Sequence, residues 1–318
     1  MNPFTTTKSE SVSAWGESRL IREISRWLGS TSPGAPAGIG DDCAVISGSP
    51  HAQLVTVDPV IYGEHFDDQV TPQAAGAKLL KRNLSDIAAM GGRPRAAVVA
   101  LALDAKVSQK WLAGFYRGLA NTARLYDVPI VGGDIAHHAG GLVATLTLIG
   151  EVTHRRAVSR SGAREGDWIY VTGRLGGSRL GYHWKFKPRL AEGAWLAERP
   201  EVRAMLDVSD GMAKDVLSIT PAGCRAELEE ARIPISRSAQ TLARQTGQTP
   251  LSHALTDGED YELLFAVNSA IDRSAFEQAW RNAFRIRLTC VGRFTKSSRS
   301  RTPGTVDLRS VHGFEHLR

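Results

Sequence analysis

Residues 72–103, PQAAGAKLLKRNLSDIAAMGGRPRAAVVALAL, decide the fold class of this chain. The first part predicts a helix over residues 73–90, with Thr71 as N-cap and Pro72 in the first turn, where proline is well tolerated. The small residues 88–92 follow, and they suit close backbone packing. Residues 97–103 are apolar and contain β-branched residues, which predicts a strand.

Strand and helix patterns continue to alternate on both sides of this stretch. Strands are predicted at residues 53–57, 142–152, 168–172, 261–267 and 288–294. A second helix, over residues 108–126, places five apolar side chains on one face, which indicates core packing: Trp111, Leu112, Phe115, Leu119 and Ala123. The alternation predicts a mixed α/β fold.

A polar segment divides the chain into two predicted domains. Residues 155–167 are charged and lack apolar periodicity, so we place a boundary near residue 154. A length of 318 residues also suits two domains, 1–154 and 155–318. The first dozen residues are polar, and we expect them to be mobile.

Composition narrows the function classes. The net charge is +6, but lysine and arginine are spread along the chain, so nucleic-acid binding remains a minor alternative. No apolar run approaches the roughly 20 residues of a membrane-spanning helix, and no secretory signal pattern begins the chain. The three cysteines lack metal-ligand spacing, which favours reduced thiols in a cytoplasmic protein.

Acidic motifs recur beside glycines or after apolar runs. Gly38 to Asp42 reads GIGDD; Asp58 follows a predicted strand, and Asp86 lies three residues after Asn83 on a helix face. Asp134 follows a glycine pair, and Asp207 and Asp210 bracket two residues. Each motif alone is typical of a turn. Together they could deliver carboxylates to one crevice, and carboxylates with phosphates are the usual ligands of Mg²⁺.

The known phosphate-binding motifs of two large nucleotide-binding classes are missing from the sequence. There is no Walker A sequence and no His-Arg-Asp or Asp-Phe-Gly set. Residues 173–178, GRLGGS, follow a predicted strand and are the best candidate for a phosphate cradle, although such a pattern is weak by itself.

Five segments in order resemble the thiamine-monophosphate kinase family, which shares a superfamily with aminoimidazole ribonucleotide synthetase. They are residues 38–43 (GIGDDC), 83–91 (NLSDIAAMG), 160–172 (RSGAREGDWIYVT), 207–211 (DVSDG) and 258–263 (GEDYEL). The resemblance implies a two-domain fold with a strand-rich, dimerising N-terminal domain that binds metal and ATP. A C-terminal α/β domain would complete the active site. It also implies a homodimer that uses several Mg²⁺ ions to transfer the γ-phosphoryl group of ATP to thiamine monophosphate.

The resemblance also assigns roles to single residues. The implied metal ligands are Asp42, Thr56, Val57, Asp58, Asp86, Asp134, Asp207 and Asp210. Nucleotide contacts are implied for Gly133, Asp134, Arg160 and Ser209, and substrate contacts for His65, Glu259 and Phe314. Asp42, Asp210 and Arg160 are the implied catalytic residues. The acceptor phosphate is already ionised at neutral pH, so no strong general base and no phosphoenzyme are expected.

Departures from the family pattern keep two alternatives open. Val57 and Ile135 stand where the family commonly has hydroxyl residues, and the stretch between the halves is shortened to residues 185–189. One alternative is another ATP-dependent enzyme of the superfamily; the other is a non-catalytic nucleotide-binding derivative. Retention of all six aspartates argues against the second, because clustered carboxylates without a cation destabilise a fold.

Overall fold

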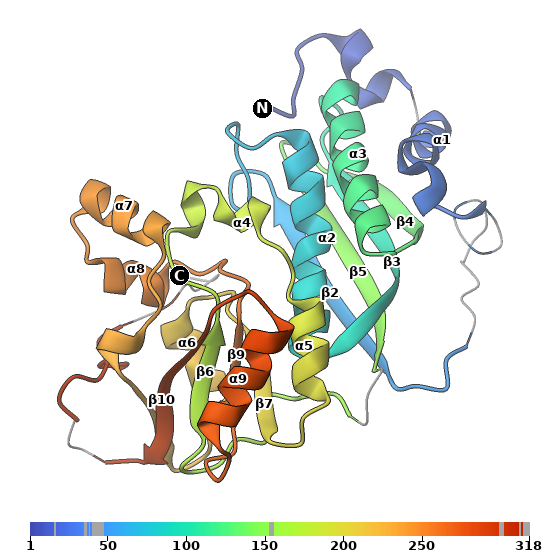
Figure 1. The fold of residues 1–318 in the computed structure, drawn as a ribbon. Helices are drawn as coiled ribbons and strands as arrows, with labels where there is room; N and C mark the ends of the chain where they lie inside the picture. Colours follow the sequence, from blue (N-terminus) through green and yellow to red (C-terminus); the bar gives the residue numbers. More distant parts are fainter. Residues whose placement is uncertain are drawn as a thin grey trace. The chain divides into compact units, whose positions relative to one another are not determined.

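The computed structural model describes residues 1–15, 17–34, 37, 39, 48–152, 156–298, 302–311 and 313. The chain divides into two compact units (Figure 1). The first contains Met1–Ile87 and Arg93–Val152, and the second contains Ala88–Gly92 and Thr153–Arg318. The division after Val152 lies close to residue 154, but residues 88–92 group with the second unit. The roles of the two domains stay predictions.

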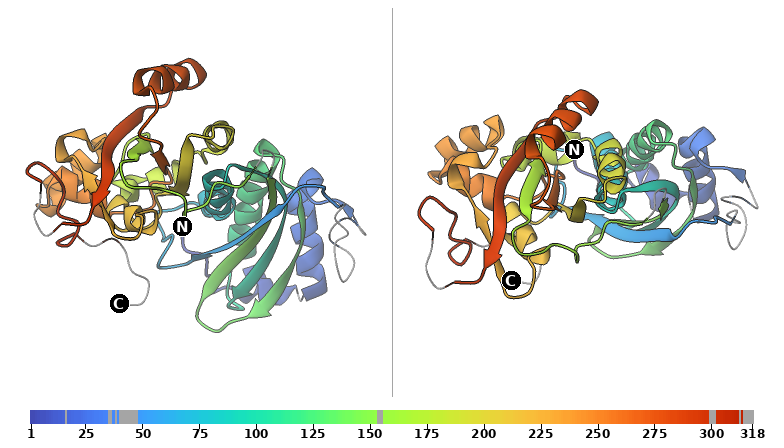
Figure 2. Two further views of the ribbon diagram at one scale, coloured as in Figure 1. Left: turned by 90° about the horizontal axis from the view of Figure 1, so that it is seen from below. Right: turned by 60° about the horizontal axis from the view of Figure 1, so that its bottom comes forward.

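The first unit contains a four-stranded sheet with helices on one face. The strand order is β2 (Gln53–Ile61), β5 (Leu142–Val152), β3 (Gly92–Leu103) and β4 (Ile130–His137). Strands β2 and β5 are antiparallel, and β3 and β4 are parallel. Helices α2 (Pro72–Ala89) and α3 (Gln109–Leu125) lie on the same face (Figure 2), and α1 (Glu17–Leu28) lies beside α3. Among the described residues β2 is an edge strand of this sheet, a position that accommodates Pro59.

Glycines allow α2 and α3 to pack closely. A Cβ atom on Gly76 would lie 2.0 Å from the carbonyl oxygen of Phe115, and one on Gly118 would lie 2.0 Å from that of Gln73. The predicted apolar face of α3, from Trp111 to Ala123, is buried. Ser108 caps this helix by accepting a hydrogen bond from the backbone N–H of Trp111.

The expectation of a mobile N-terminus is wrong. The N–H of Thr5 donates to the carbonyl of Lys106, and the N–H of Val12 donates to that of Val107. Val12 is buried, and the Trp111 indole donates to the Met1 carbonyl at 2.9 Å. Backbone pairing, which side-chain polarity does not reveal, holds this segment.

The second unit contains a five-stranded antiparallel sheet covered on both faces. The strand order is β7 (Val202–Asp207), β9 (Leu263–Val267), β6 (Trp168–Thr172), β10 (Leu288–Lys296) and β8 (Cys224–Leu228). One core cluster contains residues of α5 (Leu190–Ala197) and α9 (Arg273–Ala283). The other contains residues of α6 (Met212–Ser218) and α8 (Pro250–Thr256). The described residues of this unit also form the α-helices α4 (Tyr182–Lys185) and α7 (Arg237–Thr246).

The mixed α/β prediction is confirmed, and the predicted bounds of β5 and β6 match the structure. Strand β9 begins two residues later than predicted, because Glu259 and Tyr261 adopt left-handed φ angles of 53° and 51°. Among the described residues, no helix is long and apolar enough to cross a membrane.

Candidate active site

Three predicted metal ligands of the first unit lie on facing parts of β2 and α2. The Thr56 hydroxyl donates to Asp86 Oδ2 at 2.5 Å. Asp58 lies two residues along β2, on the same side as Thr56, and its Oδ1 is 3.3 Å from the Arg82 guanidinium. Arg82 lies one helical turn before Asp86. A carboxylate pair with a basic neighbour therefore occupies this helix–strand contact.

The prediction that Asp58 follows a strand is wrong, and Asp134 also lies within a strand. Both lie inside strands, because β2 continues to Ile61 and β4 continues to His137. These strands form opposite edges of the sheet. With a strand spacing of about 4.8 Å, three steps separate them by about 14 Å. The fold of the first unit thus gathers Asp58 and Asp86, but it does not bring exposed Asp134 to them through neighbouring strands.

Gly133 has a structural reason to be glycine. A Cβ atom there would lie 2.0 Å from the carbonyl oxygen of Val99 on β3. The predicted nucleotide contact at Gly133 therefore coincides with a close strand–strand approach, next to exposed Asp134.

His65 is fixed by the loop that joins β2 to α2. Its Nδ1 accepts a hydrogen bond from the N–H of Ile61 at 3.3 Å, and its carbonyl accepts one from the fully buried Lys78 Nζ at 2.8 Å. Val57, whose carbonyl is a predicted ligand, carries a side chain that is 58% exposed on the other side of β2.

In the second unit, two of the five segments that carry the family resemblance, residues 207–211 and 258–263, interlock through their backbones. The N–H of Glu259 donates to the Ser209 carbonyl, and that of Tyr261 donates to the Val208 carbonyl, both at 2.8 Å. The N–H of Val208 donates in turn to the Glu262 carbonyl at 2.8 Å. The segment with Asp207, Ser209 and Asp210 is therefore locked to the segment with Glu259, although about fifty residues separate them in the chain.

Helix α6 adds two residues that the sequence analysis missed. Asp215 Oδ2 accepts hydrogen bonds from the N–H groups of Ser209 and Asp210, both at 3.0 Å. Lys214 Nζ donates to Asp210 Oδ2 at 2.6 Å. Burial, and then the carboxylates of Asp207 and Asp210, raise the pKa of Asp215 to about 7. The sequence offers one signal for these two residues: Lys214 and Asp215 follow Asp210 by about one helical turn.

Glu259 is placed by a cluster of ring side chains. Its Oε2 lies 3.4 Å from His183 Nδ1, and its Oε1 accepts a hydrogen bond from the Tyr261 hydroxyl at 3.2 Å. Tyr261 stacks on Phe186, with ring centroids 3.9 Å apart. Phe186 belongs to the shortened stretch 185–189, which therefore packs against the Glu259 segment.

The same stretch neutralises a buried acid. Arg189 Nε donates to Glu262 Oε2 at 2.8 Å, and Glu262 is 1% exposed. The hydroxyls of Thr172 and Tyr182 also donate to Glu262, at 2.6 Å and 3.0 Å. Arg189, Thr172 and Tyr182 all donate to Glu262, so this network fixes the end of the segment that carries Glu259.

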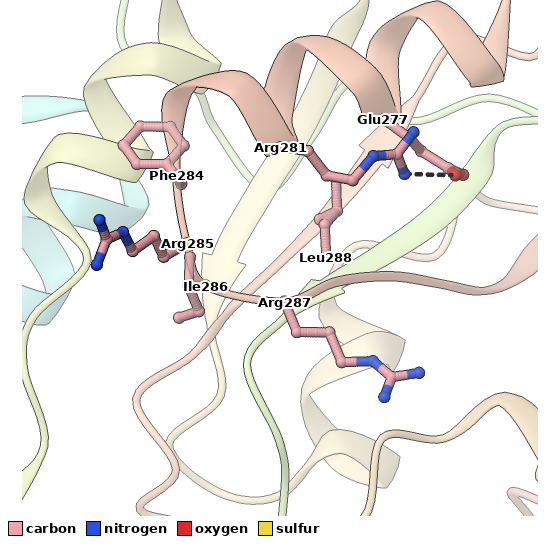
Figure 3. A pocket seen from close by; sticks show the side chains of 7 residues that line it. All are labelled: Glu277, Arg281, Phe284, Arg285, Ile286, Arg287 and Leu288. Atoms are coloured by element: carbon pink, nitrogen blue, oxygen red, sulfur yellow. Dashed lines mark ion pairs between the residues drawn. The ribbon is translucent and has the colours of Figure 1, made fainter.

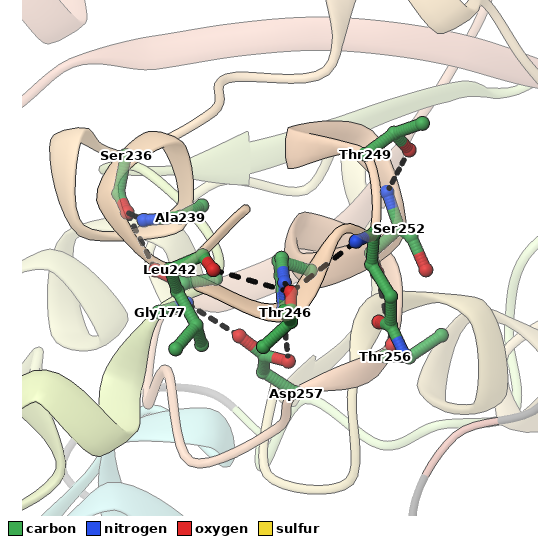
Figure 4. Close-up of polar contacts among 12 residues, drawn as sticks. Gly177, Ser236, Ala239, Leu242, Thr246, Thr249, Ser252, Thr256 and Asp257 are labelled. Carbon is green, nitrogen blue, oxygen red and sulfur yellow. Dashed lines mark hydrogen bonds and ion pairs between the residues drawn. The ribbon is translucent and has the colours of Figure 1, made fainter. Parts of the chain in front are cut away.

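The phosphate-cradle hypothesis for residues 173–178 is not supported. The N–H of Gly176 donates to Asp260 Oδ1 at 2.8 Å, and that of Gly177 donates to Asp257 Oδ2 at 2.7 Å. Figure 4 shows the Asp257 carboxylate directed at Gly177. His253 Nδ1 holds the other oxygen of Asp257 at 2.8 Å. These amides are already used by carboxylates of the chain, so the loop binds the Asp257–Asp260 segment.

One of the predicted residues takes no part in these contacts. Arg160 is exposed beside β7, where the neighbouring Ser159 carbonyl accepts a hydrogen bond from the N–H of Met205. Asp42 and Phe314 lie outside the described residues. Their predicted roles stay predictions.

A surface pocket lies elsewhere in the second unit, where α9 leads into β10. Its lining includes Arg281, Arg285 and Arg287. Figure 3 shows Arg285 and Arg287 pointing in different directions, and Arg281 pairs with Glu277 at 3.9 Å. The guanidinium groups do not converge, and none of the predicted site residues lines this pocket.

The donor chemistry of the acidic residues fits a hard cation such as Mg²⁺. Asp207 and Asp215 are both buried, and burial followed by the charge of Asp207 raises the pKa of Asp215, so a cation bound here would offset the repulsion between the two carboxylates. On α2, buried Asn83 Oδ1 has no hydrogen-bond partner among the described residues. In the part of the chain that the structure describes, no group of three or more His, Cys, Asp or Glu side chains lies together in a way that could hold a metal ion.

Comparison with known proteins first defines the class. The family model "AIR synthase related protein, N-terminal domain" matches residues 40–152. The mixed α/β fold in two units, each with predicted metal-binding aspartates, is consistent with that class. The AaThiL structure complexed with AMPPCP and TMP has a TM-score of 0.67 and 26% identity, covering 98% of this chain and 100% of that one.

Sequence relatives then give the particular family. The thiamine-monophosphate kinase of Rhodopirellula baltica is 40% identical, over 74% of this chain and 77% of the relative. That of Escherichia coli K12 is 33% identical, over 96% of this chain and 99% of the relative. The chain belongs to the thiamine-monophosphate kinase family.

Proposed function

We propose that this protein transfers the γ-phosphoryl group of ATP to thiamine monophosphate, giving thiamine diphosphate and ADP. Membership of the family supports the reaction, and the related structure with AMPPCP and TMP supports the two substrates. The observation that carries the proposal is the interlock of two loops, because Ser209 accepts a hydrogen bond from Glu259 through their backbones. The implied phosphate-handling and acceptor-handling residues thereby share one rigid support.

The reaction demands that two polyanions meet, and the chain offers groups for this task. Mg²⁺, when bound, would neutralise phosphate charge and orient the transferring group. Asp42, Asp58, Asp86, Asp134, Asp207 and Asp210 would hold the several Mg²⁺ ions between them, together with the Thr56 hydroxyl and the Val57 carbonyl. Exposed Arg160 would contribute positive charge to the ATP phosphates. The donor sets contain only oxygen, which suits this ion.

Glu259 would bind the thiamine end of the acceptor. Its carboxylate carries a charge opposite to that of the thiazolium ring, and His183 and Tyr261 hold it at 3.4 Å and 3.2 Å. His65 and Phe314 would complete the acceptor contacts. Because the attacking phosphate oxygen is already ionised, the chain needs to position it and need not remove a proton.

We also propose a homodimer in the cytoplasm. On the side of β2 away from α2, Val55 is 69% exposed and Val57 is 58% exposed. Val98 on β3 also belongs to this open sheet face, which is uncovered by any helix in the described part of the unit. A second copy of the chain would bury these apolar side chains. Free thiols at Cys224 and Cys290 suit a reducing compartment.

The direct test is an assay of thiamine diphosphate formed from thiamine monophosphate and Mg-ATP. Asp210→Asn should lower turnover roughly 100-fold or more, because a charge-stabilising group is lost, while the melting temperature stays near the wild-type value. Asp272→Asn is the control, since this exposed residue only caps α9. Full activity of Asp210→Asn would refute the metal assignment. ATP consumption without thiamine diphosphate would indicate another acceptor, and ATP binding without consumption would indicate the non-catalytic alternative.

A further inference from the structure

Asp215 is a buried carboxylate that is hydrogen-bonded to the loop carrying two predicted metal ligands, Asp207 and Asp210. It is 7% exposed and lies in the first turn of α6. One of its oxygens, Oδ2, accepts both the Ser209 N–H and the Asp210 N–H at 3.0 Å. Two consecutive peptide groups of the loop are therefore fixed by a single atom.

We propose that Asp215 is a positioning residue, which aims Asp207 and Asp210 at a shared divalent cation without ligating it. The inference rests on the proposed function. The loop is held on its other side by the Glu259–Ser209 and Tyr261–Val208 backbone hydrogen bonds. Asp215 closes the remaining side, so the two peptides that flank Ser209, directly before Asp210, cannot rotate. Supporting groups of this kind commonly change metal affinity 10- to 100-fold when they are removed.

The geometry separates the role of the oxygen from that of the charge. Because one oxygen accepts both N–H groups, the amide oxygen of Asn can replace it at the same place. Glu retains the charge but moves the oxygen by one methylene group. A positioning role therefore predicts that Asp215→Asn is mild, and that Asp215→Glu and Asp215→Ala are severe.

The experiment measures the Mg²⁺ concentration that gives half of the metal-induced rise in melting temperature, with a non-hydrolysable ATP analogue and no acceptor. We expect this concentration to rise about tenfold in Asp215→Ala and Asp215→Glu, and to stay within about threefold in Asp215→Asn. Asp272→Ala, which also removes a carboxylate that accepts a backbone N–H at a helix start, is the control. It should lower the melting temperature without changing the Mg²⁺ midpoint.

Two results would overturn the proposal. Equal loss of Mg²⁺ affinity in Asp215→Asn and Asp215→Ala would make the carboxylate itself a ligand. Wild-type Mg²⁺ affinity in Asp215→Glu would show that the placement of this oxygen does not matter, and this comparison still decides if Asp215→Ala fails to fold. The titration does not depend on thiamine, so absence of thiamine diphosphate synthesis in the wild type would refute the proposed function separately.

Discussion

The ammonium group of Lys214 forms an ion pair with a predicted metal ligand, Asp210. Its Nζ lies 2.6 Å from Asp210 Oδ2, and both side chains are partly exposed. Mg²⁺ must compete with this ammonium group for the same oxygen. A partly exposed ion pair contributes up to about 1 kcal/mol, so Lys214→Met should lower the half-saturating Mg²⁺ concentration by at most about fivefold.

A Mg²⁺ titration of activity at low and high salt checks this prediction. Salt screens exposed charges, so the difference between wild type and Lys214→Met should shrink as salt increases. Lys110→Met, at an exposed position of α3, is the control and should leave the Mg²⁺ requirement unchanged. A higher Mg²⁺ requirement in Lys214→Met would instead mean that Lys214 assists the phosphates.

At the level of elements, two adjacent glycines in β4, Gly132 and Gly133, differ in the space available for a side chain. A Cβ atom on Gly133 would meet the Val99 carbonyl at 2.0 Å, whereas one on Gly132 would lie 3.5 Å from Val98 Cγ1, an ordinary contact. Gly133→Ala should therefore destabilise the protein by about 2 kcal/mol through overpacking, and Gly132→Ala should have a much smaller effect. Urea unfolding of both variants measures the difference, and equal stabilities would contradict the close β3–β4 approach.

Strands β3 and β5 are joined by a buried acid with two basic partners. Hydrogen bonds from Arg93 and then Ser49 lower the pKa of Glu151 to about 2, and Arg95 lies 3.1 Å away. A carboxyl whose pKa is lower in the folded state stabilises the fold above its unfolded pKa of about 4.3. That stabilisation is lost as the pH falls toward 2.

The corresponding prediction concerns thermal unfolding as a function of pH. Glu151→Gln should melt at a lower temperature than wild type at pH 7, and the two curves should converge between about pH 4 and pH 2. A difference that persists unchanged at pH 2 would assign the effect to packing. Glu198→Gln, an exposed acid, serves as the control.

Periodic elements were predictable from sequence, but contacts between distant segments were not. Helix α3 and strand β5 carry strong 3.6- and 2-residue patterns, so their positions were found. Short strands β7 and β8 lack a comparable length of pattern and were missed. Asp215 and Lys214 resembled ordinary helix charges, because their partners become evident only after the loop folds back on α6.

At the level of the whole molecule, the open face of the first sheet predicts the oligomeric state. Val55→Lys would place a charge on this face and should convert a dimer into a monomer, because a buried unpaired charge opposes association. Light scattering coupled to size-exclusion chromatography measures the mass. Leu125→Lys is the control, since Leu125 is 74% exposed on α3. An unchanged mass for Val55→Lys would exclude this face as the interface.

The left-handed backbone of the Glu259 segment lowers the stability of the folded protein at a place that the proposed activity requires. Glu259 and Tyr261 have φ angles of 53° and 51°, and each such residue destabilises the folded state by about 1 kcal/mol. Directed evolution for heat resistance alone would favour Glu259→Gly, which removes this strain together with the carboxylate proposed to bind the acceptor. A thermostable biocatalyst made from this chain should therefore keep residues 258–261 unchanged and take its stabilising substitutions from other parts of the two units.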